Sequence, residues 1–148
     1  MKILLINPPD KNTIVADNPS FIDEERGINP PLGLLYIAAY LRQNSNHQIE
    51  VLDTLVEGID YEKLPDIIRQ KSPDLIGITA MTFTLVDVMK TAKIVKSISE
   101  DIKVVLGGPH TTIYPRETAD LKEIDFVVSG EGEKIFLELI NNINNYAY

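Results

Sequence analysis

The stretch Lys103-Val104-Val105-Leu106-Gly107-Gly108-Pro109-His110 decides the fold that this sequence predicts. Its aliphatic residues run directly into two glycines and a proline, which indicates a buried parallel strand whose end comes close to another group. In an open α/β sheet, ligands bind outside the carboxyl ends of the strands. The Gly107-Gly108 pair therefore indicates either a tight turn or a wall for a flat ligand, and we take the second as the sharper hypothesis.

The rest of the chain repeats this pattern of an apolar strand followed by a helix. Aliphatic runs predict strands over residues 2–6, 48–53, 74–82, 103–107 and 124–129. Helical spacing predicts helices over about 30–43, 61–71, 85–98 and 133–143, with a short irregular helical segment over 111–121. We therefore predict a doubly wound, Rossmann-like or flavodoxin-like α/β fold: a five-stranded parallel sheet of order 2-1-3-4-5 with helices on both faces.

This strand order brings separate loops to one edge of the sheet. Residues 10–29 lack strand or helix periodicity, so we expect a long loop there, with Asn29 placed to cap the next helix. The turns that follow strands one, three, four and five should converge. They span residues 7–10, 79–83, 107–110 and 130–133.

Size and composition narrow the classes of protein. A chain of 148 residues that is 44% hydrophobic is long enough for one domain. We place it at residues 1–144, with 145–148 as a tail or the start of a linker to an absent catalytic domain. The net charge of -8 and pI of about 4.7 argue against nucleic acid and anionic membranes as partners. Because the chain has no Cys, no membrane-spanning run and no signal peptide, we expect a cytoplasmic protein.

Most ligands of such a sheet require a motif that this sequence lacks. Asn7-Pro8-Pro9 stands where a dinucleotide-binding domain has its glycine-rich turn, and where a flavodoxin has its phosphate loop. A P-loop is also absent. A phosphoacceptor receiver needs an aspartate at the end of strand three, where Thr79-Ala80-Met81-Thr82 stands. What remains is a ligand recognised by shape and by close approach of the backbone.

Four segments in order resemble the N-terminal cobalamin (B12)-binding domain of B12-dependent radical SAM enzymes. The resemblance is to enzymes of the anaerobic magnesium-protoporphyrin IX monomethyl ester oxidative cyclase type, and it covers essentially the whole chain. The segments are Met1–Pro9, Pro30–Leu41, Gly107–His110 and Asp125–Glu133.

The resemblance implies a set of cofactor-binding residues. In that family the corrin lies over the carboxyl edge of the sheet, and its nucleotide tail enters a cleft between the sheet and a flanking helix. Thr79 and Met81 match a Ser-x-Leu motif, and the Thr79 hydroxyl can hydrogen-bond the tail base. Gly107 and Gly108 match paired glycines that line the tail cleft. The implied residues at the start of the last helix, near the tail's other side, are Gly130, Glu131 and Gly132.

The sequence departs from histidine-ligated cobalamin proteins at the loop after strand one. Asp10-Lys11-Asn12-Thr13 lacks the histidine that supplies the lower cobalt ligand in mutases and methionine synthase. His47 and His110 are poor substitutes by position. Bound cobalamin is therefore expected base-off, without a histidine ligand from this chain. The 4Fe-4S cluster and S-adenosylmethionine of a radical SAM enzyme would belong to a barrel beyond Tyr148, because this chain has no Cys.

The resemblance implies a cobalamin-binding module of a larger radical SAM enzyme, for methyl transfer or oxidative cyclisation. The fragment alone should catalyse nothing. One alternative is a structural or docking domain of the same fold that has lost cobalamin; another is a nucleotide-sugar or coenzyme enzyme. Taken singly, Thr79 and Met81 also suit a strand end, Pro30–Gly33 suits a helix start, and Glu131 suits the first turn of a helix.

Overall fold

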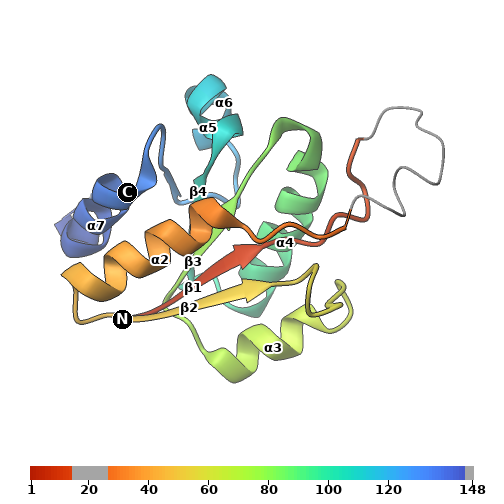
Figure 1. Ribbon diagram of the computed structural model, residues 1–148, viewed down its shortest axis with the longest axis horizontal. Helices are drawn as coiled ribbons and strands as arrows, with labels where there is room; N and C mark the ends of the chain where they lie inside the picture. The colour runs from red at the N-terminus through yellow and green to blue at the C-terminus, as the bar shows by residue number, and fades with distance from the viewer. Residues whose placement is uncertain (15–26, 146–148) are drawn as a thin grey trace.

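The protein forms a five-stranded parallel sheet of order β2-β1-β3-β4-β5, as predicted (Figure 1). The computed structural model describes residues 1–14 and 27–145. The strands are β1 (Lys2–Asn7), β2 (Gln48–Asp53), β3 (Leu75–Thr79), β4 (Lys103–Gly107) and β5 (Phe126–Val127). Since β1 lies between β2 and β3, the direction of winding reverses beside it, and the carboxyl ends of all strands lie at one edge.

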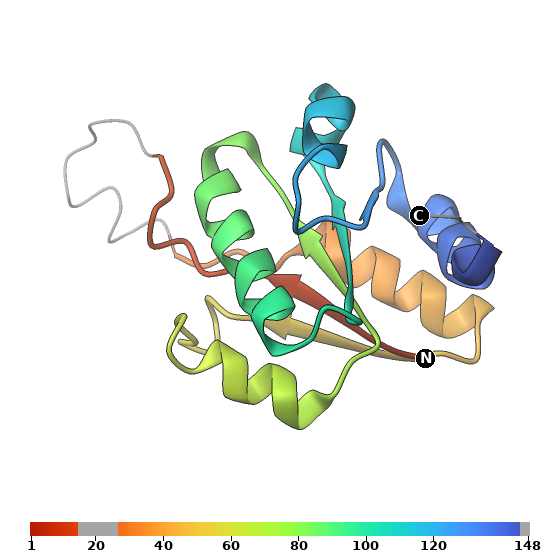
Figure 2. The ribbon, with the colours of Figure 1, turned by 180° about the vertical axis from the view of Figure 1, so that it is seen from behind.

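Helices cover both faces of the sheet (Figures 1 and 2). On one face lie α2 (Leu32–Asn44) and α7 (Gly132–Asn142); on the other lie α3 (Leu64–Lys71) and α4 (Leu85–Ile98). The shorter elements are η1 (Thr82–Thr84), α5 (Pro109–Ile113), α6 (Pro115–Ala119) and η2 (Ile143–Asn145). Among the described helices, none is long and apolar enough to cross a membrane.

The strands alternate their side chains between two apolar cores. Leu4 and Ile6 of β1 pack toward α3 and α4, whereas Ile3 and Leu5 pack toward α2 and α7. All four side chains are at most 1% exposed. A central parallel strand is buried on both faces, so the side chains on both of its faces must be apolar. This requirement explains the unbroken aliphatic run within Lys2–Ile6.

Several helices and strands begin or end at other residues than the sequence predicted. Helix α2 begins after Pro31 without a side-chain cap, so Asn29 does not cap it. The segment over 61–71 is a helix only from Leu64. The expected third strand stops at Thr79, because 3₁₀ helix η1 follows, and the fifth is only Phe126–Val127. The part of the predicted 10–29 loop over residues 15–26 lies outside the described residues.

Candidate functional site

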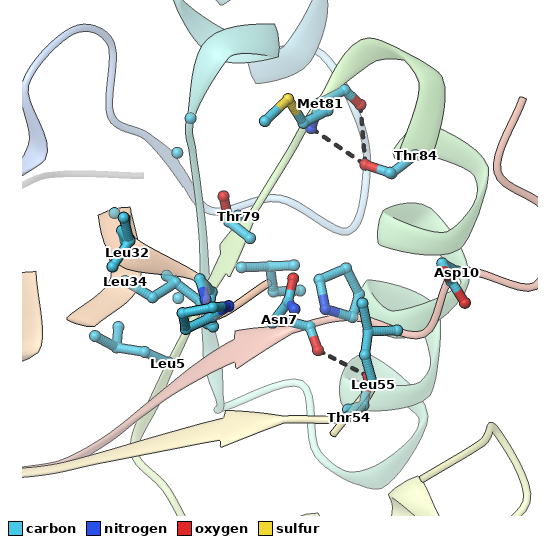
Figure 3. A pocket seen from close by; sticks show the side chains of 18 of the residues that line it. Leu5, Asn7, Asp10, Leu32, Leu34, Thr54, Leu55, Thr79, Met81 and Thr84 are labelled. Carbon is cyan, nitrogen blue, oxygen red and sulfur yellow. Dashed lines mark hydrogen bonds between the residues drawn. The ribbon is translucent and has the colours of Figure 1, made fainter. Parts of the chain in front are cut away.

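A cavity of about 750 Å³ lies at the carboxyl edge of the sheet. The four turns predicted to converge there all contribute to its lining, which confirms the sequence-based placement. Asn7, Asp10, Thr79 and Met81 show two of these turns in Figure 3. The structure also brings together every residue that the resemblance implied as cofactor-binding. These lining residues are Thr79, Met81, Gly107, Gly108, Gly130, Glu131 and Gly132.

The inner part of the cavity lies against two rows of residues on the α2 and α7 face of the sheet. Residues two apart on a strand share a face. Leu5 pairs with Gly77, and Gly77 pairs with Val105, which gives the inner row. One step toward the carboxyl edge, Thr79 pairs with Gly107. Phe136 and Leu5 cover Gly77 in the inner row, so we call the space over Thr79 and Gly107 the slot.

Apolar side chains from α2, α7 and the turn after β5 wall the slot. The wall residues are Leu34, Ile37, Val128 and Phe136. A Cβ on Gly77 would lie 3.2 Å from Phe136 Cε2 and 2.7 Å from Leu5 Cδ2. Gly77 therefore lets α7 pack closely on the sheet. The slot is a space between the sheet and two helices, open toward the carboxyl edge.

The two glycines of the opening stretch have different roles. A Cβ on Gly107 would meet nothing closer than Val128, at 3.9 Å, so Gly107 leaves open space in the slot. Gly108 has φ +106°, and its Cβ would lie 2.8 Å from the Ala80 carbonyl oxygen. This conformation is nearly restricted to glycine. Gly108 is therefore required by the approach of the protein's own backbone, whereas only Gly107 opens the slot itself.

The start of α7 forms another side of the cavity. Gly130 has φ +81° and open space around it, so the chain turns there toward the helix. A Cβ on Gly132 would lie 2.7 Å from Ile37 Cδ1, which means that Gly132 lets α7 approach α2. Glu131 is the N-cap residue, and no side chain caps this end of the helix. The first-turn N–H groups of α7 therefore face the cavity side without a side-chain partner.

The end of β3 and the turn after it contribute two polar and two apolar residues to the cavity lining, namely Thr79, Met81, Phe83 and Thr84. Thr79 ends the strand, and among the described residues its hydroxyl has no hydrogen-bond partner. Met81 is 42% exposed, and its backbone N–H and carbonyl both bond the Thr84 hydroxyl, at 3.2 and 3.1 Å (Figure 3). Phe83 is 45% exposed. Met81 therefore belongs to the mouth of the cavity, and Thr79 to its interior.

A buried carboxylate that sequence reasoning missed holds the loop after β1 against α4. Asp87 is fully buried and accepts bonds from the Asn12 backbone N–H, at 2.8 Å, and from Asn12 Nδ2, at 2.6 Å. The Thr13 and Tyr61 hydroxyls also donate to it. Burial and this carboxylate raise the pKa of Tyr61. Since Thr13 lines the cavity, Asp87 positions one of its walls.

Two further segments line the cavity, and neither carries a binding motif. One spans residues 27–34, where Pro30 and Pro31 suggested only a helix start. The other follows β2, where the Thr54 hydroxyl donates to the Asn7 carbonyl at 2.8 Å (Figure 3). A pattern of polar side chains with a shared spacing could have revealed them, but neither segment has one.

Neither histidine lies on the cavity. His47 is at the opposite, amino end of the sheet, where its Nδ1 is 3.3 Å from the N-terminal amine. Burial and that amine lower its pKa. His110 is 6% exposed, and its Nδ1 is 3.1 Å from the Thr82 hydroxyl. The His110 ring is therefore held by a side-chain hydroxyl of η1.

The fold and the slot define a doubly wound α/β domain with a cavity at the carboxyl edge of its sheet. The sequence matches the B12 binding domain family over residues 22–140. The chain belongs to this family.

Known relatives are longer proteins. The chain is 39% identical over 145 residues to an uncharacterised methyltransferase of Pyrococcus horikoshii, covering 97% of this chain and 30% of that protein. It is 31% identical over 116 residues to the anaerobic magnesium-protoporphyrin IX monomethyl ester cyclase of Rubrivivax gelatinosus, covering 78% and 21%. The solved radical S-adenosylmethionine methyltransferase TsrM of Kitasatospora setae, with cobalamin and a 4Fe-4S cluster bound, shares the fold, with a TM-score of 0.70, 24% identity, and coverage of 97% and 24%.

Proposed function

We propose that this chain binds cobalamin, with the corrin over the carboxyl edge and the nucleotide tail in the slot. The observation that carries the proposal is the slot itself, because it is walled by apolar side chains and kept open at Gly107. A flat aromatic base is a suitable occupant of an apolar space between a sheet and helices. Thr79 adds a hydroxyl without a partner among the described residues.

The other predicted residues have roles at the edges of this site. Met81 would contact the corrin from the mouth, whereas Gly108 supports the turn beside it. Gly130, Glu131 and Gly132 place the first turn of α7 beside the tail, where backbone N–H groups suit its phosphate. The Glu131 carboxylate opposes an anion there. Because neither histidine lines the cavity, the cofactor is proposed to bind base-off, without a histidine ligand.

We further propose that residues 1–144 serve as one module of a longer cytoplasmic radical SAM enzyme, with 145–148 leading toward its catalytic barrel. Support comes from the relatives, of which this chain covers 30% or less. That barrel would hold the 4Fe-4S cluster and S-adenosylmethionine. Bound cobalamin would supply cobalt for methyl transfer or for meeting a substrate radical in oxidative cyclisation. This chain's residues bind and orient the cofactor.

The mouth of the cavity supports a covering partner domain. Large apolar side chains from separate segments are exposed around it, and all of them line the cavity. They are Ile28, Leu32, Met81 and Phe83. Such a concentration of exposed apolar groups is typical of an interaction surface. The same exposed apolar side chains would serve the alternative function, in which the chain is a docking domain that has lost cobalamin.

Retention of hydroxocobalamin tests the proposal. The 148-residue chain is incubated with the cofactor and desalted, and its visible spectrum is recorded. We expect retained corrin absorbance in the wild type and in Ala39→Leu, which adds the same side chain at an exposed position outside the cavity. We expect the corrin absorbance to be lost in Gly107→Leu, because the leucine side chain fills the slot. Thermal unfolding checks that this variant is folded. No retention by the wild type would favour the docking function.

A further inference from the structure

We infer that Asn7 recognises a side-chain amide of the corrin ring, so that this site favours fully amidated corrinoids over their carboxylate analogues. The inference rests on the proposed function and adds to it a further cofactor-binding residue, which belongs to no motif. It follows from the position of Asn7, from the orientation of its amide and from the chemistry of the corrin periphery.

Asn7 lies at the centre of the carboxyl edge of the sheet. It ends β1, which lies between β2 and β3, and it lines the cavity. Figure 3 shows its side chain between Thr79, at the end of β3, and Thr54, just after β2. Pro8 and Pro9 come next in the lining, and neither has a backbone N–H. The Asn7 amide is therefore the hydrogen-bonding side chain that the end of β1 presents to a ligand.

A bond to the neighbouring strand fixes the direction in which the amide faces. Asn7 pairs with Asp53 across β1 and β2, and its Nδ2 donates to Asp53 Oδ1 at 2.9 Å. A carboxylate can only accept hydrogen bonds, so the amide nitrogen faces β2 and the amide oxygen faces away from it. Asn7 is among the residues that line the cavity, and Asp53 is not. The amide oxygen Oδ1 is therefore held toward the cavity.

The remaining groups of this amide are available to a ligand. Among the described residues, none bonds Asn7 Oδ1, and none accepts the second N–H of Nδ2. No side-chain nitrogen or oxygen atom in this part of the chain is both buried and without a partner, so Oδ1 is accessible. Asn7 therefore presents one acceptor and one donor on the same planar group. A primary carboxamide carries the complementary pair and can form two hydrogen bonds with it.

The corrin periphery supplies such carboxamides on the required side. Its propionamides project from the face that carries the nucleotide tail, and its acetamides project from the opposite face. With the tail in the slot, the propionamide face is turned toward the sheet edge where Asn7 lies. Replacing the bonded propionamide by a propionate removes the N–H that Oδ1 accepts, and it places an anion near Asp53. The loss of one such hydrogen bond lowers affinity by about tenfold.

The monocarboxylic acids of hydroxocobalamin, each with one propionamide hydrolysed, test the inference on the 148-residue chain. Dissociation constants are measured by titration of the visible spectrum. We expect one of the three isomers to bind at least about tenfold more weakly than hydroxocobalamin and than the other two. Carboxylates that line the cavity repel all the isomers alike, so the difference between isomers carries the assignment. These carboxylates belong to Asp10, Asp60, Glu131 and Glu133.

The other outcomes of this titration are distinct. Equal affinity for hydroxocobalamin and all the acids, or an equal weakening of all the acids, would overturn the inference and leave the proposed function standing. No binding of hydroxocobalamin would overturn both. This comparison uses the wild-type chain, so it does not depend on the folding of any variant.

Asn7→Ala shows whether the discrimination belongs to this side chain. We expect the affinity for hydroxocobalamin to fall by about twofold to tenfold, and the disfavoured acid to bind as well as its isomers. Thermal unfolding checks that the variant is folded. Discrimination that persists in folded Asn7→Ala would overturn the assignment to Asn7.

Two further variants separate the amide from the charge beside it. Asp53→Asn removes that charge but keeps an oxygen that can accept the bond from Asn7 Nδ2, so we expect the discrimination between isomers to remain. Its loss would assign the effect to the Asp53 charge and overturn the inference. Asn44→Ala is the matched control, because Asn44 lies outside the cavity lining and its side chain donates to the Tyr40 carbonyl. We expect all its dissociation constants to equal those of the wild type.

Discussion

Lys96 Nζ lies 2.7 Å from Asp125 Oδ2, and this ion pair joins α4 to the start of β5 at the amino end of the sheet. The side chains are 9% and 14% exposed. The same carboxylate oxygen accepts the Val104 backbone N–H at 2.7 Å, so Asp125 also fixes the start of β4.

We expect Asp125→Asn to lower the free energy of unfolding by about 2–3 kcal/mol, because it leaves the Lys96 charge without its counter-ion. Denaturant unfolding measures the change. Glu50→Gln is the matched control, because the ion pair between Glu50 and Lys71 is more exposed. This substitution should change the free energy of unfolding little. Cobalamin retention should not change, because the pair lies at the end of the sheet opposite the cavity. A loss of retention in a folded variant would contradict that separation.

The adjacent glycines Gly107 and Gly108 should respond differently to alanine. Gly108→Ala is expected to destabilise the fold by about 1–3 kcal/mol, because its positive φ is nearly restricted to glycine and its Cβ would meet the Ala80 carbonyl. Gly107→Ala should change stability by less than about 1 kcal/mol, since its Cβ has ordinary contacts. Thermal and denaturant unfolding of both variants compare them directly. Equal destabilisation would contradict the assignment of Gly107 to the open slot.

Asp87→Asn should disturb the loop after β1. The amide cannot accept all the bonds that Asn12, Thr13 and Tyr61 donate to the buried carboxylate. We expect a loss of about 2–3 kcal/mol in the free energy of unfolding, together with weaker cobalamin retention. Asp66→Asn is the control, because Asp66 is exposed and bonds only Arg69 in the described structure. An unchanged stability in Asp87→Asn would show that the cluster is not structural.

The sequence could predict the sheet because each central strand is an aliphatic run, and such runs suit strands buried on both faces. It also predicted the edge at which the turns meet, since parallel strands end together. It could not predict where the fifth strand ends, because only Phe126 and Val127 find a partner in β4. Asp87 was missed for a related reason: its partner Asn12 is 75 residues away, and an acid in the first turn of a helix ordinarily faces solvent.

The raised pKa of Tyr61 gives a dependence of stability on pH. Burial and the Asp87 carboxylate both favour the neutral phenol in the folded state. The unfolded chain loses this proton near the ordinary value of about 10, whereas the folded protein retains it, so stability falls as the pH rises above that value.

Tyr61→Phe isolates this contribution. Near neutral pH the variant should be less stable by about 1 kcal/mol, because the hydrogen bond to Asp87 is lost. Above a pH of about 10 the gap should narrow, since only the wild type pays the cost of keeping the phenol neutral. Denaturant unfolding at several pH values measures the gap. A gap that is constant with pH would contradict a raised folded-state pKa.

The positions of the histidines predict the electronic state of bound cobalamin. The chain has two histidines; His47 lies at the far end of the sheet, and His110 bonds Thr82 outside the cavity lining. We therefore expect base-off cob(II)alamin whose electron paramagnetic resonance lines lack splitting by a nitrogen ligand. His47→Gln and His110→Gln should leave that spectrum unchanged, although His110→Gln should lower stability because the buried ring loses its contacts with Thr82 and Tyr114. Nitrogen splitting that disappears in either variant would show that the loop holding that histidine moves to the cobalt.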